Sequence, residues 1–253
     1  MGKKIAIVNQ KGGVGKSTTA VNLGACLAEN GCKVLLIDID PQGNATSGVG
    51  IEKSTAELTT YNVLIEDVPA EKAVVKTETE NLHIIPANIE LAGAEIELVS
   101  IISRESKLKN VIKPIVDHYD YIIIDCPPSL GLLTLNALTA ADSIMVPIQC
   151  EYYALEGLGQ LMQTVELVRK NLNSDLRIEG VVMTMYDART NLSQQVIKEV
   201  KDYFSNLVFE TVIPRNVRLS EAPSFGKPIL SYSSNSSGAE AYRNLAEEVI
   251  NNE

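Results

Sequence analysis

Short runs of apolar and β-branched residues recur along this chain, and segments with apolar residues at helical spacing separate most of them. The runs are almost continuously apolar, which is typical of strands covered on both faces in a parallel sheet. We expect strands at residues 5–8, 34–37, 121–124, 143–148, 178–183 and 208–213, with a weaker one at 82–85. We expect helices at residues 16–29, 91–102, 105–118, 132–141, 155–171, 192–204 and 239–251.

This alternation predicts an α/β fold: a doubly wound, mostly parallel sheet with helices on both faces. The chain has 253 residues and shows no internal repeat, low-complexity tract or linker. Residues 1–253 are therefore expected to form a single domain, a common size for an undivided α/β fold.

Composition and cysteine spacing indicate the cellular compartment of the protein. No apolar stretch approaches the roughly 20 residues that cross a bilayer, and the N-terminus has too few apolar residues for a signal peptide. The four cysteines form no C-x-x-C pair and have no neighbouring histidine, so disulfides and zinc are not expected. These features favour a cytoplasmic protein that does not associate with membranes.

The most informative segment is 10–18, Gln-Lys-Gly-Gly-Val-Gly-Lys-Ser-Thr, between the first strand and the first helix. Glycines let the backbone curl so that successive N–H groups face one anion, and a helix starting at Lys16 adds its positive end. Lys16 can then reach the β- and γ-phosphates of a nucleotide, and the Ser17 hydroxyl can bind Mg²⁺. The segment predicts a nucleoside-triphosphate site.

This loop departs from the usual pattern G-x-x-x-x-G-K-[ST]. Counting back from Lys16 puts the first glycine of the pattern at position 10, where this chain has Gln10. A second lysine, Lys11, stands just before the paired glycines Gly12 and Gly13.

Two acidic positions at predicted strand ends complete the candidate site. Asp125 ends an apolar strand, and strand ends in such sheets face the ligand crevice, so we expect it to support Mg²⁺ through a coordinated water. Capping of the next helix is the alternative role for Asp125.

Asp40 follows the second strand on a turn that Pro41 and Gly43 induce, where it could orient water for attack on the γ-phosphate. The alternative for Asp40 is a purely structural turn residue.

The net charge of −10 argues superficially against a nucleic-acid partner. The charge is unevenly spread, however, because glutamates dominate residues 52–105 and the last helix. The stretch 186–228 carries a locally basic set: Arg189, Lys198, Lys201, Arg215, Arg218 and Lys227. An acidic protein can still present one basic face.

Together these motifs resemble those of the deviant P-loop ATPases of the ParA/Soj type. The matching segments are 11–18, 38–46, 125–129, 149–153, 187–190 and 213–218, and the resemblance runs from about residue 3 to residue 250. Such proteins bind ATP and Mg²⁺ and form a homodimer with two nucleotides between the subunits. The ATP dimer binds double-stranded DNA without sequence preference, which implies a nucleoid-associated protein. A ParB/Spo0J-type centromere-binding partner stimulates ATP hydrolysis, and the ADP form leaves the DNA.

The resemblance also implies roles for single residues. Lys11 matches the lysine that reaches the partner subunit's nucleotide, where it can supply transition-state charge. Gly12 would lie where the two backbones approach, so a side chain there should clash. Asp40 matches the residue that positions the attacking water. The remaining matched positions are nucleotide-binding Gly13, Val14, Gly15, Lys16, Ser17 and Thr18, adenine-contacting Pro214 and Asn216, and DNA-binding Arg189 and Arg218.

Three other readings share the phosphate loop. A MinD-like positioning ATPase works on the membrane and needs a C-terminal amphipathic helix with a basic face, whereas residues 239–253 carry four glutamates against Arg243. Iron–sulfur relatives need converging cysteines, and Cys126 and Cys150 read better as small buried residues. A small-molecule ligase or kinase would need a pocket for an organic acceptor.

Overall fold

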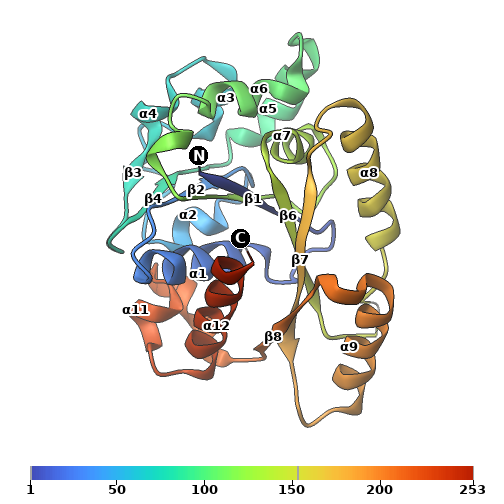
Figure 1. The fold of residues 1–253 in the computed structure, drawn as a ribbon. Helices are drawn as coiled ribbons and strands as arrows, with labels where there is room; N and C mark the ends of the chain where they lie inside the picture. Colours follow the sequence, from blue (N-terminus) through green and yellow to red (C-terminus); the bar gives the residue numbers. More distant parts are fainter. Residues whose placement is uncertain (1, 153, 253) are drawn as a thin grey trace.

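The computed structural model describes residues 2–152 and 154–252, and one sheet of eight strands runs through it (Figure 1). The spatial order is β3-β4-β2-β5-β1-β6-β7-β8, and of these pairings only β3 with β4 is antiparallel. The strands are β1 Lys3–Ile7, β2 Val34–Asp38, β3 Val75–Lys76, β4 Leu82–Ile85, β5 Tyr121–Asp125, β6 Ser143–Gln149, β7 Arg177–Tyr186 and β8 Val208–Pro214. The predicted doubly wound, mostly parallel sheet is confirmed.

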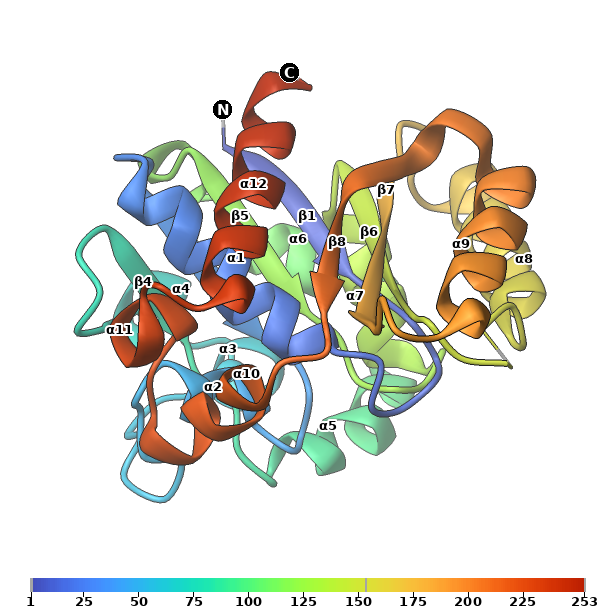
Figure 2. The same cartoon turned by 90° about the horizontal axis from the view of Figure 1, so that it is seen from below.

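Helices cover both faces of this sheet, as Figures 1 and 2 show. One face packs on α1 (Lys16–Glu29), α2 (Asn44–Gly48), α10 (Val217–Glu221), α11 (Ile229–Ser233) and α12 (Ser237–Asn251). The other face packs on α3 (Thr60–Ile65), α4 (Ala70–Ala73), α5 (Leu91–Glu97), α6 (Lys107–Ile112), α7 (Leu132–Ala140), α8 (Leu158–Asn171) and α9 (Asn191–Phe204). The continuous apolar strand pattern follows from this two-sided burial.

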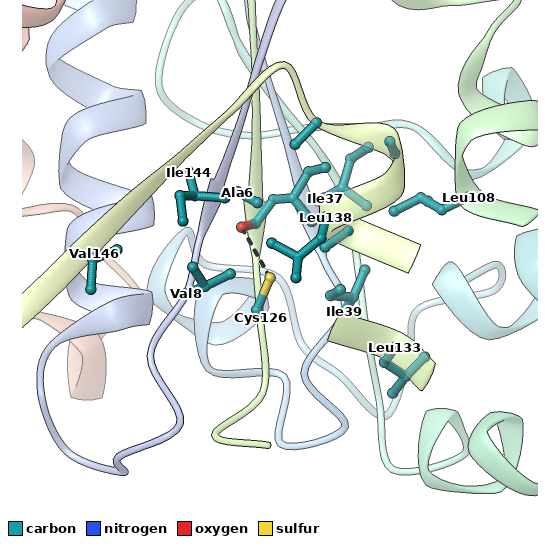
Figure 3. Close-up of a cluster of buried hydrophobic side chains, with 14 of the residues drawn as sticks. Ala6, Val8, Ile37, Ile39, Leu108, Cys126, Leu133, Leu138, Ile144 and Val146 are labelled. Carbon is teal, nitrogen blue, oxygen red and sulfur yellow. Dashed lines mark hydrogen bonds between the residues drawn. The ribbon is translucent and has the colours of Figure 1, made fainter. Parts of the chain in front are cut away.

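The core of the second face lies directly behind the ends of β1, β2 and β5 (Figure 3). Side chains of Val8, Ile39 and Leu133 are buried there, and the Cys126 thiol donates to the Ile124 carbonyl at 3.8 Å. Burial raises the pKa of the Cys126 thiol well above its usual value. Cys126 is therefore a small core residue, and Cys26 and Cys150 are likewise buried thiols outside any disulfide.

Two predicted helices differ from those in the structure. The segment 105–118 is broken into α6 and a 3₁₀ turn at Val116–His118, because Pro114 lacks the N–H that would continue the helix. The helix expected at 91–102 ends at Glu97 and tightens into a 3₁₀ turn at Leu98–Ser100. Arg104 stabilises that end by donating from Nη1 to the Val99 carbonyl at 2.7 Å.

Candidate nucleotide site

The loop between β1 and α1 has the backbone that an anion cradle requires. Gly13 and Gly15 adopt left-handed φ values of 77° and 91°, which only glycine enters freely. The loop is tied to β7, where the Thr184 hydroxyl donates to the Val14 carbonyl at 2.8 Å. A glycine-rich loop held in this shape before a helix N-terminus is a preformed phosphate site.

Lys16 is buried at the first position of α1 and is only 7% exposed. Its ammonium donates to the Lys11 carbonyl at 3.1 Å, and burial lowers its pKa, while the nearby carboxylates of Asp125 and Asp40 act in the opposite direction. A buried cation at a helix N-terminus concentrates positive charge where the loop amides point.

Asp125 ends β5 beside this lysine and is 1% exposed. Neither carboxylate oxygen has a hydrogen-bond partner among the described residues. Its pKa is raised well above the usual value by burial and then by the charge of Asp38, while the neighbouring Ser17 and Lys16 oppose that shift. A buried carboxylate without partners fits a magnesium–water complex, because Mg²⁺ keeps several waters and needs few protein ligands.

In the structure, the two carboxylates at the end of β2, Asp38 and Asp40, have different hydrogen-bond partners. Asp38 accepts bonds from the Thr46 amide (2.8 Å), the Thr46 hydroxyl (2.7 Å) and the Asp40 amide (3.1 Å), so it anchors the loop. Burial raises the pKa of Asp38 to about 6. Asp40 is 4% exposed and accepts from the Gln42 amide at 2.9 Å, so it is held on its turn rather than free to move.

Lys16 and Asp40 line one cavity of about 550 Å³, whereas Asp38 and Asp125 are not among its lining residues. Its walls include Asp40 from the second strand end and Pro128 from the loop after Asp125. The phosphate loop contributes Gly12, Gly13, Gly15, Lys16, Ser17 and Thr18. Among the described residues, no cluster of three or more His, Cys, Asp or Glu could hold a metal on its own.

A second cavity of about 240 Å³ shares Gly15 and Thr18 with the first and is lined by Pro214 and Asn216. The Asn216 side chain is engaged in structure, because it accepts from the Arg218 amide at 2.8 Å and donates to the Ser237 hydroxyl at 2.9 Å. The predicted adenine contact of Asn216 thus competes with its role as the N-cap of α10.

Met185 is a residue that the sequence reading missed. It lines both cavities and has a φ of 53°, which is costly for a residue with a Cβ. No sequence signal marks such a position, because methionine at a strand end usually packs in the core.

Lys11 lies beside the cavity, and its ammonium forms an ion pair with Glu151 of the same chain. Both side chains stay about one-third exposed. A Cβ added to Gly12 would meet no atom within 4 Å, so nothing in the described chain requires glycine there. The predicted clash at Gly12 can only come from a second molecule.

The two predicted DNA-binding arginines follow neighbouring strand ends, since Tyr186 of β7 is in register with Pro214 of β8. Arg189 is 85% exposed and makes a two-point ion pair with Asp187. Arg218 on α10 is 58% exposed and pairs with Glu221. Helices α9 and α10 lie on opposite sides of β8 (Figure 2).

Comparison with known proteins agrees with this geometry. Residues 2–178 match the family described as AAA domain. The sporulation initiation inhibitor protein Soj of Bacillus subtilis (strain 168) is 66% identical over 252 residues, covering 100% of both chains. The chromosome-partitioning ATPase Soj of Treponema pallidum (strain Nichols) is 52% identical, covering 99% of this chain and 98% of its own. The chain belongs to the Soj/ParA family of chromosome-partitioning ATPases.

The fold of this Soj/ParA chain is shared with solved structures. Cobyrinic acid a,c-diamide synthase from Mycobacterium smegmatis, solved with a bound ATP analogue and magnesium, superposes with a TM-score of 0.87. It is 40% identical and the match covers 99% of this chain and 95% of that one. The P-loop ATPase fold is therefore established.

Two residues beside this Soj/ParA site have no predicted contact with the nucleotide, but they form hydrogen bonds that position the loops of the site. Thr46 satisfies Asp38 and also accepts from the Ala87 amide at 2.9 Å. The Asn9 carboxamide accepts from the Lys11 amide at 2.9 Å and donates to the Pro147 carbonyl at 2.8 Å. Thr46 lies inside a motif segment and Asn9 just before one, but Ala87 and Pro147 are distant from them in sequence, and only the fold reveals these two contacts.

Proposed function

We propose that this protein is an ATP-driven switch for chromosome or plasmid partitioning whose ATP-bound homodimer binds double-stranded DNA without sequence preference. The observation that carries the proposal is the 550 Å³ cavity in which the phosphate loop, Asp40 and Pro128 meet. The whole of residues 1–253 serves as one ATPase domain in this proposal.

In the proposed ATP complex, residues Gly13 to Thr18 hold the phosphates and Lys16 neutralises the β- and γ-oxygens. Ser17 and, through a coordinated water, Asp125 hold Mg²⁺, which supplies positive charge to the phosphates. The unpartnered oxygens of Asp125 support this assignment. Pro214 and the neighbouring backbone form the wall against which the adenine packs.

Asp40 positions the attacking water in the proposed hydrolysis of ATP to ADP and phosphate. Its carboxylate lines the phosphate cavity and is already oriented by the Gln42 amide. A nearly buried carboxylate with a fixed orientation can hold water in line with a γ-phosphate without a large loss of entropy.

Lys11 acts in the proposed dimer rather than in the single chain. Its Glu151 ion pair holds the ammonium at the edge of the cavity, and Gly12 leaves the loop open to an approaching subunit. When a second copy docks, Lys11 exchanges Glu151 for the partner's phosphates and completes the site.

Arg189 and Arg218 form part of the proposed DNA-binding surface. Both guanidiniums are exposed and lie beyond the ends of adjacent strands. No helix-turn-helix is present among the described elements, so contacts to phosphate rather than to bases are expected. A ParB/Spo0J-type partner would stimulate hydrolysis and release the protein from the nucleoid.

The MinD-like alternative needs a helix that can leave the fold for a membrane. In α12, the side chains of Tyr242, Leu245 and Val249 are fully buried against α1 and the sheet. Arg243 is paired with Glu29 at 2.6 Å. In the described parts of the chain, no helix has both the length and the apolarity of a membrane span.

The deciding experiment measures DNA binding with ATP, ADP and a slowly hydrolysed ATP analogue, alongside light scattering of the free protein. We expect a dimer and salt-sensitive DNA binding with ATP and the analogue, and neither with ADP. DNA binding that is equal in all three nucleotide states would refute the switch. Consumption of ATP only when an organic acceptor is added would favour a ligase or kinase.

A further inference from the structure

Four large apolar side chains on α5 and on the turns before and after it are exposed. Ile89, Ile96, Val99 and Ile102 are 68%, 78%, 58% and 93% exposed, and we call them the α5 surface. Helix α5 lies at the lower edge of Figure 2, away from α1 and α12. Exposed apolar residues that cluster in this way mark interaction sites more often than scattered ones do.

Helix α5 has a second apolar side besides the α5 surface, and that side packs on the protein core. Leu91, Ala94 and Leu98 point inward and are fully buried. A surface helix normally has one apolar stripe, with polar residues opposite. Here Ile89 and Ile96 occupy the opposite side, so the second apolar stripe needs an explanation other than folding.

Carboxylates flank the α5 surface. Glu66, Glu90 and Glu97 line a shallow groove of about 460 Å³ together with Tyr61 and Asn62. The Tyr61 hydroxyl donates to Glu97 at 3.0 Å, and this bond, with the charges of Glu97, Glu66 and Glu90, raises the Tyr61 pKa. The groove beside the apolar residues is thus strongly negative.

We infer that the α5 surface docks an amphipathic, positively charged segment of a partner protein, with its apolar side on Ile96 and Ile102 and its cations on Glu90 and Glu97. A second copy of this chain fits less well, because the chain has a net charge of −10 and a symmetric contact would oppose the same carboxylates. The inference deepens the proposed function, since it assigns a place to the stimulating partner.

The surface is connected to the nucleotide cavity. A Cβ on Gly131 would lie 2.1 Å from the Glu95 carboxylate, so α5 packs tightly on the loop that follows Asp125. Pro128 of the same loop lines the phosphate cavity. One carboxylate oxygen of Glu95 is buried and has no hydrogen-bond partner. A small shift of α5 would therefore break no hydrogen bond at this oxygen, but it would change the surroundings of the loop. Docking on α5 therefore reaches the magnesium-supporting strand end.

The test uses the full chain with Mg-ATP and DNA and a labelled helical peptide of about 18 residues with leucines on one face and lysines on the other. A scrambled peptide of the same composition is the control. We expect binding by fluorescence anisotropy that weakens with salt, and faster ATP hydrolysis. The double variant I96S/I102S should bind the peptide about tenfold less tightly or worse, with unchanged basal hydrolysis and DNA binding.

Leu167→Ser is the matched control, because Leu167 is 62% exposed and belongs to α8, which Figure 2 shows apart from α5. Peptide affinity of I96S/I102S equal to that of Leu167→Ser would overturn the inference, as would a wild-type protein that binds the scrambled peptide equally well. Loss of ATP-dependent dimerisation in I96S/I102S would instead assign the surface to a second copy. Absence of ATP-dependent DNA binding in the wild type would count against the proposed function. Peptide binding to the wild type and to I96S/I102S would still test the α5 surface, because it does not depend on DNA.

Discussion

Three buried carboxylates meet at one edge of the sheet, and their surroundings give them different tasks. Asp38 is satisfied by three hydrogen bonds and shapes the loop. Asp40 is oriented by one backbone amide, and Asp125 has no hydrogen-bond partner among the described residues. A buried carboxyl group without hydrogen-bond partners lowers stability, which supports the proposal that Asp125 serves binding rather than folding.

Replacing Asp125 by Asn should therefore stabilise the nucleotide-free protein at pH 7.5, by on the order of 1–2 kcal/mol, because an amide avoids the cost of a buried carboxyl group that must either carry a charge or take up a proton. The native pKa of Asp125 is raised, so the native state holds its proton at pH values where the unfolded chain has lost it. Wild-type stability should fall as pH rises through that native pKa, and the variant should show a smaller fall. Denaturant unfolding at pH 5 and pH 7.5 measures both effects.

Asp38 remains in that variant and adds its own decline in stability, between its unfolded pKa near 3.8 and its native pKa of about 6. The variant should also lose the stabilisation that Mg-ATP gives the wild type. A variant that is less stable than wild type without nucleotide at pH 7.5 would contradict the assignment.

Asp40→Ala tests the water-positioning role. We expect ATP binding and ATP-dependent dimerisation to persist while hydrolysis falls by about 10²-fold or more, since a positioned acid–base group contributes that much. Single-turnover hydrolysis with partner and DNA present is the measurement. Asp142→Ala serves as the control, because Asp142 lies at the opposite, amino-terminal end of β6 and pairs with Lys4.

At the scale of elements, parallel strands bring separate motifs to one edge. Ile7 and Asp38 are both in register with Asp125, so the ends of β1, β2 and β5 converge. Because this follows from strand order alone, the sequence could predict the phosphate loop and its acids together. The short helices α2, α3, α10 and α11 could not be placed, because five or six residues carry too little periodicity. Pro114, by contrast, does mark the break after α6 in the sequence, and the prediction of one helix over 105–118 overlooked it.

Strand β7 offers a matched test of the DNA surface. Arg189 follows its carboxyl end, and Arg177 stands exposed at its amino end. Arg189→Glu should weaken DNA binding at least about tenfold and reduce the salt slope by about one, while Arg177→Glu should leave both unchanged. Both variants should still dimerise with ATP, which light scattering checks; equal losses in the two would mean that the effect is one of net charge alone.

At the scale of the whole molecule, the sequence could predict the fold class and the phosphate-loop residues and Asp40 that line the cavity, but not contacts made across it. Lys11 illustrates the limit, because its ion pair with Glu151 joins residues 140 positions apart. Likewise Met185 and Thr184 enter the site from a strand that carries no nucleotide motif. Such contacts depend on how the sheet is wound, which local patterns do not encode.

Gly12→Val separates folding from assembly. The site of the added side chain is open, so the variant should match wild type in thermal stability and in ATP binding. It should remain a monomer by light scattering with ATP and should not bind DNA. The control is Gly159→Val on α8, where an added Cβ also meets nothing within 4 Å. An ATP-dependent dimer of Gly12→Val would place the subunit contact elsewhere.

The bond from Thr184 to the Val14 carbonyl joins the phosphate loop to the strand that continues into Asp187 and Arg189. In the proposed switch, any bias that nucleotide places on the loop would pass along backbone residues 184–189 to the Arg189 guanidinium. Thermodynamic linkage would make that bias reciprocal: if Arg189 holds DNA, bound DNA would tighten ATP binding by the same factor by which ATP tightens DNA binding. The nucleoid would then slow ATP release and lengthen the lifetime of the bound state before a partner ends it.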